Sequence, residues 1–184
     1  MSNKKLSAKF FYKNHHVIVR ERNVKLPNGT KIKHFPLVTH NDGVVVVPFI
    51  IRMGKKYIML VKQQRIAMNV RTLEVVGGVI ERAGPRKTAI KEVEEETGLT
   101  VKKLIYMGQN LPGPGWYTET QYNFLAECYP EIGKQQLDDT ESIKRMLVSV
   151  EKVKEMLRER SIKDLKTKAA LYEALEFFKT AKDM

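Results

Sequence analysis

Four glutamates stand close together at positions 92 and 94–96, in a segment of strongly helix-forming residues. In a helix, Glu92 and Glu96 are four residues apart and Glu95 lies beside them, so three carboxylates share one face. Each like-charged pair on an open surface costs about 0.2–0.5 kcal/mol. One interpretation is a solvated acidic face that Lys91 partly offsets. The other is a site for a hard cation such as Mg²⁺, which takes oxygen ligands.

The residues around these glutamates are more specific than their charge. Residues 91–99 read Lys-Glu-Val-Glu-Glu-Glu-Thr-Gly-Leu, and Gly77 and Gly78 precede them at the distance of a loop. This arrangement resembles the signature of Nudix hydrolases, G-x5-E-x7-R-E-U-x-E-E-x-G-U, in which U is aliphatic. The second half of the signature is present at every defined position except Lys91, where the family has Arg.

The first half of the signature departs from the family pattern. Counted from Gly77, the position of the first family glutamate holds Ala83. Counted from Gly78, that position holds Gly84 and the loop is one residue short, while Glu81 is nearby but out of register. The missing glutamate bears on how the loop is anchored and on how tightly metal binds.

The resemblance implies a set of protein ligands for Mg²⁺, with Mn²⁺ as a substitute. Glu92 and Glu96 would be the principal ligands with Glu95 supporting them, and Glu96 would also count among the catalytic groups. The Gly77 carbonyl would be a further ligand, and the competing interpretation is a glycine needed only for a sharp turn. Such metals neutralise phosphate oxygens, orient the attacking water and stabilise the leaving phosphate.

An acidic segment further along the chain supplies candidates for the catalytic base. Residues 138–143 read Asp-Asp-Thr-Glu-Ser-Ile and resemble the family's acidic segment before a strand. By position, Glu141 is the first candidate for a metal ligand or base, and Asp139 is the second. Metals nearby favour the carboxylate form, so such a base would work at neutral pH. The competing interpretation is an ordinary solvated loop.

Further stretches are similar to one Nudix subfamily, the ADP-ribose and nucleoside-diphosphate-sugar pyrophosphatases. Residues 61–65 and 72–78 resemble its V-R-Q-x-R and E-L-P-A-G blocks, with Val76 in place of the Pro. Residues 114–126 resemble its P-G-x-x-x-E and F-L-A blocks. The resemblance covers roughly residues 45–150. It implies hydrolysis of the pyrophosphate bond of ADP-ribose or a related nucleoside-diphosphate sugar, giving a nucleoside monophosphate and a sugar phosphate.

The same blocks hold the candidate substrate contacts. Arg65 is the preferred phosphate contact because a guanidinium meets phosphate in a two-pronged geometry, and pairing with Glu74 or Glu119 is the alternative. Arg71 is a second basic candidate. Trp116, the only Trp, lies in a loop rich in Pro and Gly, where stacking on a base or on a partner subunit competes with plain loop packing. Glu119 either joins the metal site or holds an arginine.

The composition excludes several classes of protein. Hydrophobic residues make up 42% of the 184, which is too many for a disordered chain. No apolar run approaches the roughly 20 residues that span a bilayer, and the N-terminus has no apolar core of a secretion signal. The single Cys128 cannot form an internal disulfide and is expected to be a buried small hydrophobe. We therefore expect a soluble cytoplasmic protein with no membrane partner.

The net charge of +12 is unevenly distributed along the chain. The first 80 residues hold 15 basic and 3 acidic residues, whereas residues 113–150 hold 3 basic and 6 acidic ones. The basic first half favours an alternative function, an RNA 5′-end pyrophosphohydrolase. The missing glutamate favours another alternative, a non-catalytic nucleotide-sugar sensor on a Nudix scaffold. A nucleotide-sugar substrate remains the main expectation, with nucleic acid as the runner-up partner.

Local patterns predict the elements that position these residues. Asn28-Gly29 predicts a type I′ hairpin turn, and the run from Val44 to Ile51 predicts a buried strand in which Pro48 marks a bulge or an edge. Pro85 suits the first turn of a helix over 86–97 that Gly98 ends. The remaining expected elements are strands at 55–62, 71–76, 104–106 and 122–126 and helices at 150–159 and 163–182.

Together these patterns predict an α/β (α+β) protein of the Nudix type, an α/β/α sandwich with a mixed sheet. Residues 1–40 would form an added small antiparallel sheet, and residues 41–184 the catalytic domain. In the resembling enzymes the N-terminal sheet helps to form a homodimer, often with exchanged strands. We expect the same role for residues 1–40.

Overall fold

The computed structural model describes residues 8–137 and 142–180. The chain divides into two compact units, one made of Met1–Asp42 with Leu111–Thr120, and the other of Gly43–Asn110 with Gln121–Met184. Among the described residues, no helix is both long and apolar enough to cross a membrane.

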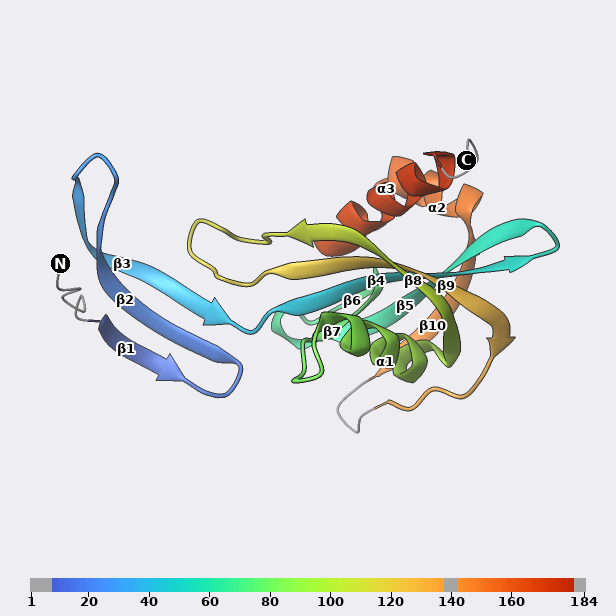
Figure 1. Ribbon diagram of the computed structural model, residues 1–184, viewed down its shortest axis with the longest axis horizontal. Coiled ribbons are helices and arrows are strands. Elements are labelled where there is room, and N and C mark those ends of the chain that lie inside the picture. Colours follow the sequence, from blue (N-terminus) through green and yellow to red (C-terminus); the bar gives the residue numbers. More distant parts are fainter. Residues whose placement is uncertain (1–7, 138–141, 181–184) are drawn as a thin grey trace. The chain divides into compact units, whose positions relative to one another are not determined.

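The first unit is a three-stranded antiparallel sheet in the order β1-β2-β3 (Figure 1). The loop of residues 111–120 pairs alongside β3, because the Val38 amide donates to the Trp116 carbonyl at 2.8 Å and the Thr118 amide donates to the Val38 carbonyl at 3.1 Å. The strands are β1 (Ala8–Lys13), β2 (Val17–Lys25) and β3 (Lys31–His40).

The turn between β2 and β3 differs from the predicted type. A type I′ turn needs positive φ at both Asn28 and Gly29, but only Gly29 has it, at 88°. The Gly29 amide instead donates to the Leu26 carbonyl at 2.9 Å, which closes a turn one residue earlier. Pro27 explains the shift, because its fixed φ suits the second position of an ordinary turn, with Gly29 taking the left-handed position after it.

The second unit is built on a seven-stranded mixed sheet, in the order β10-β5-β4-β9-β8 with β6 paired to β5 and β7 paired to β4. The pairing of β4 with β9 is parallel and the other pairings are antiparallel. A 3₁₀ turn, η1 (Ile66–Met68), follows β5. The strands are β4 (Gly43–Arg52), β5 (Lys55–Arg65), β6 (Val70–Glu74), β7 (Val76–Val79), β8 (Leu99–Asn110), β9 (Gln121–Ile132) and β10 (Ile143–Ser149).

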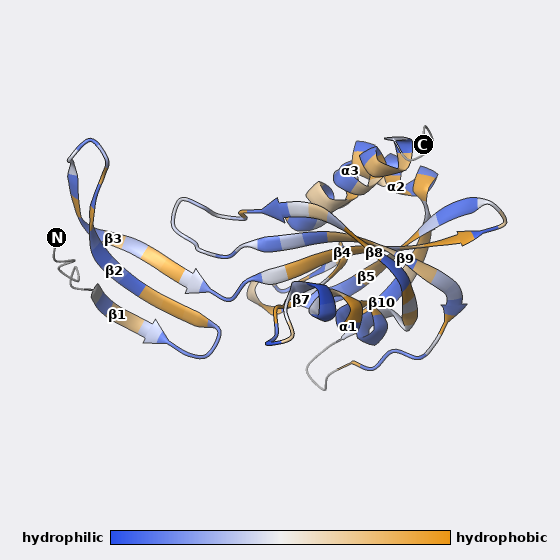
Figure 2. Cartoon of the chain, viewed as in Figure 1, coloured by the Kyte–Doolittle hydropathy of each residue, from blue (hydrophilic) through white to orange (hydrophobic). Residues whose placement is uncertain are grey.

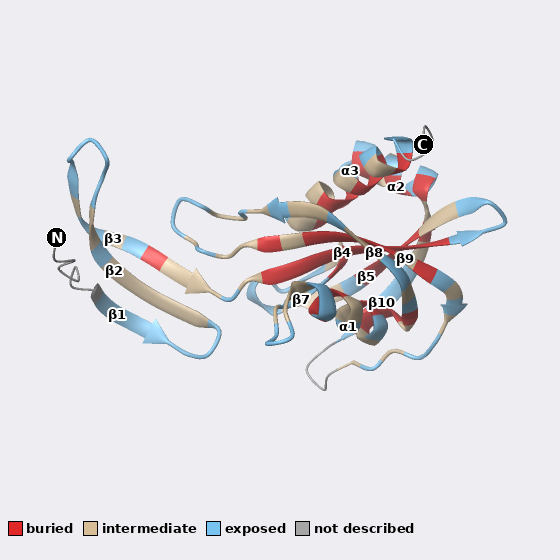
Figure 3. Ribbon diagram, viewed as in Figure 1, coloured by how far each residue is buried: buried red, intermediate tan, exposed pale blue. Residues whose placement is uncertain are grey.

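Helices cover both faces of this sheet. Helix α1 (Pro85–Thr97) lies on one face, and α2 (Val150–Arg158) and α3 (Leu165–Thr180) lie on the other (Figure 1). Each face has its own buried core, one containing Ala89 and Val93 of α1 and the other containing Val153 of α2 and Leu171 of α3. Strands β4, β5 and β9 hold long runs of buried residues, and much of β4 is hydrophobic (Figures 2 and 3). The predicted α/β/α sandwich is confirmed.

Helix α1 forms where the sequence predicts it. Pro85 occupies its first position, and Gly98 ends it in the left-handed conformation with φ of 69°. The Gly98 amide donates to the Glu94 carbonyl at 2.9 Å. A glycine is required there, since a Cβ on Gly98 would meet the Gly133 carbonyl oxygen at less than 3.0 Å.

Pro48 lies neither at a bulge nor on an edge strand, so that expectation is wrong. Strand β4 pairs with β9 in continuous register past Pro48, which stands opposite Ala126. On its other side, β4 pairs with β7 up to Val46 and with β5 from Phe49 onward. Pro48 therefore falls in the gap between two partners, where a residue without an N–H is tolerated.

Candidate functional site

Helix α1 and strand β7 meet closely at Gly78. A Cβ built on Gly78 would lie well under 3.0 Å from the carboxylate oxygen Oε1 of Glu92, a distance that real Cβ atoms do not adopt. At Gly77, a Cβ would lie 3.0 Å from the Val44 carbonyl oxygen. The first glycine thus fits the sheet closely, and the second leaves room for the Glu92 carboxylate.

The other acidic residues of α1 differ in exposure. Glu96 is only 3% exposed, whereas Glu95 is half-buried and Glu94 is exposed to solvent. Glu92 and Glu96 therefore stand one helical turn apart on the side of α1 that faces the sheet and the glycines. Of the three carboxylates predicted to share one face, Glu92 and Glu96 lie on this side of α1, whereas Glu95 is half-buried and lies near Lys91.

An ion pair connects the loop after β7 to the exposed side of α1. Lys91 Nζ lies 2.6 Å from Glu81 Oε1 and 3.5 Å from Glu95 Oε2. The hydrogen bond to Glu81 raises the pKa of Lys91 above its ordinary value. Glu81, which is out of register with the family glutamate, therefore still joins the loop to the helix. The spacing of the signature does not predict this role of Glu81.

The carboxylates of the described residues are the kind of group that binds a hard divalent cation, and they supply part of a ligand set. Carboxylate oxygens are the ligands that Mg²⁺ and Mn²⁺ prefer, and Gly78 provides the space that holds one of them. Within residues 8–137 and 142–180, no three His, Cys, Asp or Glu side chains are already gathered as a metal cluster. Asp139 and Glu141, the candidates for ligand and base, lie outside the described residues.

The segment before residue 138 is attached to the C-terminal end of α1. The Gln136 amide donates to the Glu95 carbonyl at 2.9 Å, and Gln135 Nε2 donates to the Glu96 carbonyl at 2.6 Å. These bonds satisfy carbonyls that a helix end leaves without internal partners. They also bring the chain that leads into the acidic segment to the helix that carries the glutamates.

Arg145 on β10 holds the same helix end. Its Nη1 donates to the carbonyls of Thr97 and Gly133, both at 2.7 Å. A cation at a helix C-terminus is stabilised by the helix dipole as well as by these bonds. Arg145 was missed from the sequence because no local motif identifies a contact formed across 48 residues.

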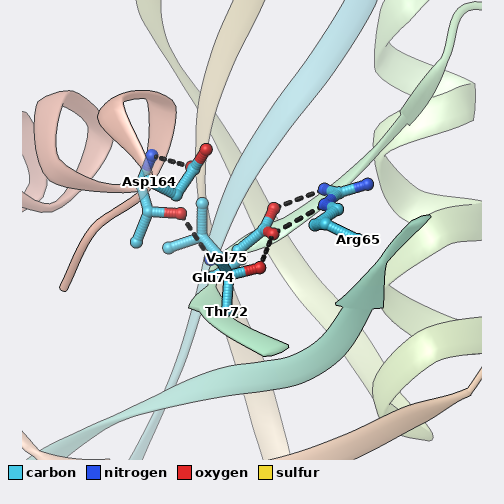
Figure 4. A network of polar contacts seen from close by, with 6 residues as sticks. Arg65, Thr72, Glu74, Val75 and Asp164 are labelled. Atoms are coloured by element: carbon cyan, nitrogen blue, oxygen red, sulfur yellow. Dashed lines mark hydrogen bonds and ion pairs between the residues drawn. The ribbon is translucent and has the colours of Figure 1, made fainter. Parts of the chain in front are cut away.

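Arg65 and Glu74 form a two-pronged ion pair between β5 and β6 (Figure 4). Arg65 Nε donates to Glu74 Oε1 at 2.7 Å and Nη2 donates to Oε2, while the Thr72 hydroxyl donates to Oε1 as well. Burial alone would raise the pKa of Glu74, but the hydrogen bonds from Arg65 and Thr72 hold it below the ordinary value. Arg65 is therefore paired with Glu74, which was the alternative to a phosphate contact.

The pairing leaves part of Arg65 for another acceptor. Glu74 occupies the Nε and Nη2 edge, and the Arg65 side chain is 43% exposed. The hydrogen bond to Glu74 is the main reason that the pKa of Arg65 is raised, and the negative charge of Glu96 adds to this effect. Arg65 is thus within electrostatic range of the acidic helix.

A second set of bonds ties this network to α3. The Val75 amide donates to Thr167 Oγ1 at 3.1 Å, and the Thr167 amide donates to Asp164 Oδ2 at 2.7 Å (Figure 4). Val75 directly follows Glu74, so the beginning of α3 is fastened beside the Arg65 pair. No local pattern predicts this link, because Thr167 and Val75 are 92 residues apart in the chain.

The remaining predicted substrate contacts lie in different surroundings. Arg71 is exposed on β6 opposite Gln64. Trp116 and Glu119 belong to the first unit, where Trp116 is 58% exposed and Glu119 Oε2 accepts a hydrogen bond of 2.5 Å from the Tyr117 hydroxyl. Burial and this bond raise the pKa of Tyr117. In the second unit, the structure brings together the acidic helix, the glycines and Arg65.

The chain is similar to known proteins. Residues 40–169 match the family model of the NUDIX domain. The chain is 35% identical over 150 residues to the ADP-ribose pyrophosphatase of Bacillus subtilis (strain 168), covering 80% of this chain and 79% of the relative. It is 27% identical over 147 residues to the GDP-mannose pyrophosphatase of Enterobacter sp. (strain 638), covering 74% and 75%.

A solved structure is also similar. The crystal structure of an ADP compounds hydrolase superposes with a TM-score of 0.76 at 16% sequence identity, covering 96% of this chain and 94% of that one. At this identity the likeness concerns the fold. It confirms the architecture predicted from the sequence.

Proposed function

Because the chain belongs to the Nudix family and is a Nudix hydrolase, we propose that it hydrolyses the pyrophosphate bond of ADP-ribose or a related nucleoside-diphosphate sugar. The oxygen of water forms a bond to one phosphorus, and the bridging P–O bond breaks. The products are a nucleoside monophosphate and a sugar phosphate. The observation that carries the substrate class is the similarity to the ADP-ribose pyrophosphatase over four-fifths of the chain.

Mg²⁺, or Mn²⁺ in its place, would be held by Glu92 and Glu96, with Glu95 and the Gly77 carbonyl as supporting ligands. When bound, the metal would neutralise phosphate charge and help to orient water. The fit of the Glu92 carboxylate against Gly78 and the burial of Glu96 support this assignment. Glu141 is proposed as a further ligand.

The chain's own groups bind the substrate and move the proton. Glu141, or Asp139 in second place, would take the proton from the attacking water, because a carboxylate beside cations stays ionised at neutral pH. Arg65 would donate from Nη1 to a phosphate oxygen while Glu74 holds the other edge of its guanidinium. Arg71 would add positive charge near the same strand pair.

Residues of the first unit are proposed to contact the base and the partner subunit. The exposed Trp116 ring would stack on a base, and Glu119, held by Tyr117, would bind a donor of the substrate or an arginine. We also propose that the sheet of residues 1–40 pairs two copies of the chain, with exchanged strands as one arrangement. Support comes from β1, an edge strand on which Phe10 and Tyr12 are 57% and 55% exposed.

Product identification tests the proposed reaction. The full chain is incubated with Mg²⁺ and, separately, with ADP-ribose, GDP-mannose, a nucleoside triphosphate and RNA carrying a 5′-triphosphate. We expect AMP and ribose 5-phosphate from ADP-ribose, or the corresponding pair from GDP-mannose, and little product from the other two. Saturable binding of a nucleotide sugar without turnover in Mg²⁺ or Mn²⁺ would instead identify a sensor.

An RNA 5′-end pyrophosphohydrolase is the second candidate. The 15 basic residues among the first 80 favour it, because phosphate contacts supply most of the affinity for nucleic acid. This candidate predicts a steep fall of RNA affinity with rising salt and release of pyrophosphate from the RNA end. A flat salt dependence contradicts it.

A further inference from the structure

A cavity of about 800 Å³ lies in the second unit, between the β4–β5 hairpin and helices α2 and α3. These helices cover the face of the sheet opposite to α1 (Figure 1). None of the residues proposed above to bind metal or substrate lines this cavity. Its lining is formed by Gly54, Lys55, Lys56, Tyr57, Ser149, Val150, Glu151, Lys154, Leu175, Phe178 and Lys179.

The inner wall of the cavity is apolar. Val150, Leu175 and Phe178 contribute to it, and each is buried in the core between the sheet and the two helices. The Nζ atom of Lys56 lies 5.3 Å from the centre of the Phe178 ring, in the geometry of a cation–π contact. The wall therefore offers an apolar, partly aromatic surface beside a positive charge.

The rim of the cavity is strongly basic. It carries Lys55, Lys56, Lys154 and Lys179 against a single carboxylate, Glu151. Lys179 is paired with Glu176 at 2.9 Å, which lies outside the lining. Across the described part of the chain, no ion pair within 4.0 Å joins the other lysines of the rim to a carboxylate.

The first turn of α2 adds to the positive potential. Ser149 caps this helix by accepting a hydrogen bond of 3.2 Å from the Lys152 amide, and Ser149, Val150 and Glu151 all line the cavity. A helix N-terminus carries a partial positive charge. This charge reinforces the lysines, and Glu151 offsets it in part.

We propose that this cavity binds a small organic anion in which a phosphate group is joined to an aromatic or apolar body. The lysines and the start of α2 would hold the phosphate, and the body would pack on Phe178 and Leu175. An inorganic anion would leave the apolar wall in water, whereas a neutral ring would leave the lysines without an acceptor. This site is separate from the pyrophosphate-hydrolysing site and does not depend on the function proposed above.

Phenyl phosphate is a suitable probe, because it joins a phosphate dianion to one aromatic ring. Isotope-labelled full-length protein is titrated without divalent metal, and the backbone amide signals of Gly54 and Glu151 are followed by NMR. We expect saturable shifts of these signals. Inorganic phosphate has the charge of the probe without a ring, and phenol has the ring without the phosphate, so each should bind more weakly by about tenfold or more.

Matched variants make the test specific for the rim. Lys56→Gln/Lys154→Gln removes two lining lysines and should weaken phenyl phosphate binding by about tenfold. Lys152→Gln/Lys163→Gln removes the same charge from residues outside the lining and should leave the affinity unchanged. Thermal unfolding of both variants verifies that they are folded.

Several outcomes would overturn the proposal. The first is an absence of saturable shifts at Gly54 and Glu151. The second is equal weakening in the two double variants, which would show a general charge effect. The third is equal affinity for inorganic phosphate, which would show that the apolar wall contributes nothing.

Discussion

The Glu92 carboxylate occupies the space in which a side chain on Gly78 would begin. Strand β7 and helix α1 can therefore approach only because residue 78 lacks a Cβ. The same contact holds a carboxylate against the strand that precedes the loop. The requirement for glycine at this position comes from the neighbouring side chain, since Gly78 has no positive φ.

We expect Gly78→Ala to reduce kcat/KM by about a hundredfold, because an added methyl group must displace Glu92 by roughly an ångström or more. Steady-state kinetics with a nucleotide sugar, together with Mn²⁺ titration, measures the effect. Val79→Ala, on the same strand, is the control and should retain activity. Full activity in Gly78→Ala would show that the position of Glu92 is unimportant.

Glu96→Gln tests the metal assignment at a buried carboxylate. The change keeps the shape of the side chain and removes its charge, so we expect a loss of Mn²⁺ affinity and of turnover by about a hundredfold or more. Glu94→Gln is the matched control, because Glu94 lies on the same helix but is exposed. Equal effects of the two substitutions would refute a specific role for Glu96.

The ion pair of Arg65 with Glu74 should control how stability depends on pH. In the native chain, folding lowers the pKa of Glu74. The ionised carboxylate therefore contributes to the free energy of unfolding above the unfolded pKa of about 4.3, and this contribution is lost as the pH falls through the folded pKa. In Arg65→Gln the buried Glu74 loses its main partner, and burial then raises its pKa.

We therefore expect Arg65→Gln to lower the free energy of unfolding by about 2–3 kcal/mol at pH 7, less than a fully buried pair because Arg65 is partly exposed. The variant should lose less of its stability than the native chain on acidification. Urea unfolding at pH 4 and 7 measures both quantities. Arg71→Gln, which removes an exposed arginine from β6, is the control. A parallel pH dependence of Arg65→Gln and the native chain would contradict the expectation.

Glu81→Gln should destabilise the protein only slightly, by about 0.2–1 kcal/mol, because the Glu81–Lys91 pair is about half exposed on both sides. Double-mutant unfolding measurements with Lys91→Gln isolate the pair. A much larger coupling energy would mean that this pair carries the whole anchoring role of the missing family glutamate.

Cys128 should be chemically inert. Its side chain is buried, and burial raises the pKa of the thiol to about 12, so almost none is thiolate at pH 8. A thiol reagent should react with the native protein far more slowly than with the unfolded chain. Cys128→Ala should keep its catalytic activity. Rapid labelling of the native protein would show that Cys128 is accessible.

Features set by neighbouring residues were predictable from the sequence. Pro85 and Gly98 mark the ends of α1, and the spacing of Glu92 and Glu96 places these two carboxylates one helical turn apart. Strand β8 spans Leu99–Asn110 and is longer than the strand that the sequence predicts at 104–106. Its pairing with β9 contains register shifts, so apolar and polar residues do not alternate regularly along it.

Features set by distant residues were not predictable. The turn at Gly29 is different, because the residue that overrides the Asn-Gly pattern is the adjacent Pro27. Pro48 was misplaced because its tolerance depends on where β7 ends and β5 begins. Arg145 and Thr167 belong to the site only through contacts with residues far away in the chain.

The division of β4 between two partners sets a distance within the site. Residues Gly43–Val46 pair with the strand that carries Gly78, and Phe49–Arg52 pair with the strand that ends at Arg65. Strand β7, which carries Gly78, and strand β5, which ends at Arg65, are therefore both held in register by the continuous strand β4. One residue inserted between Val46 and Phe49 would shift the strand that carries Gly78 by about 3.3 Å along β4 relative to the strand that ends at Arg65.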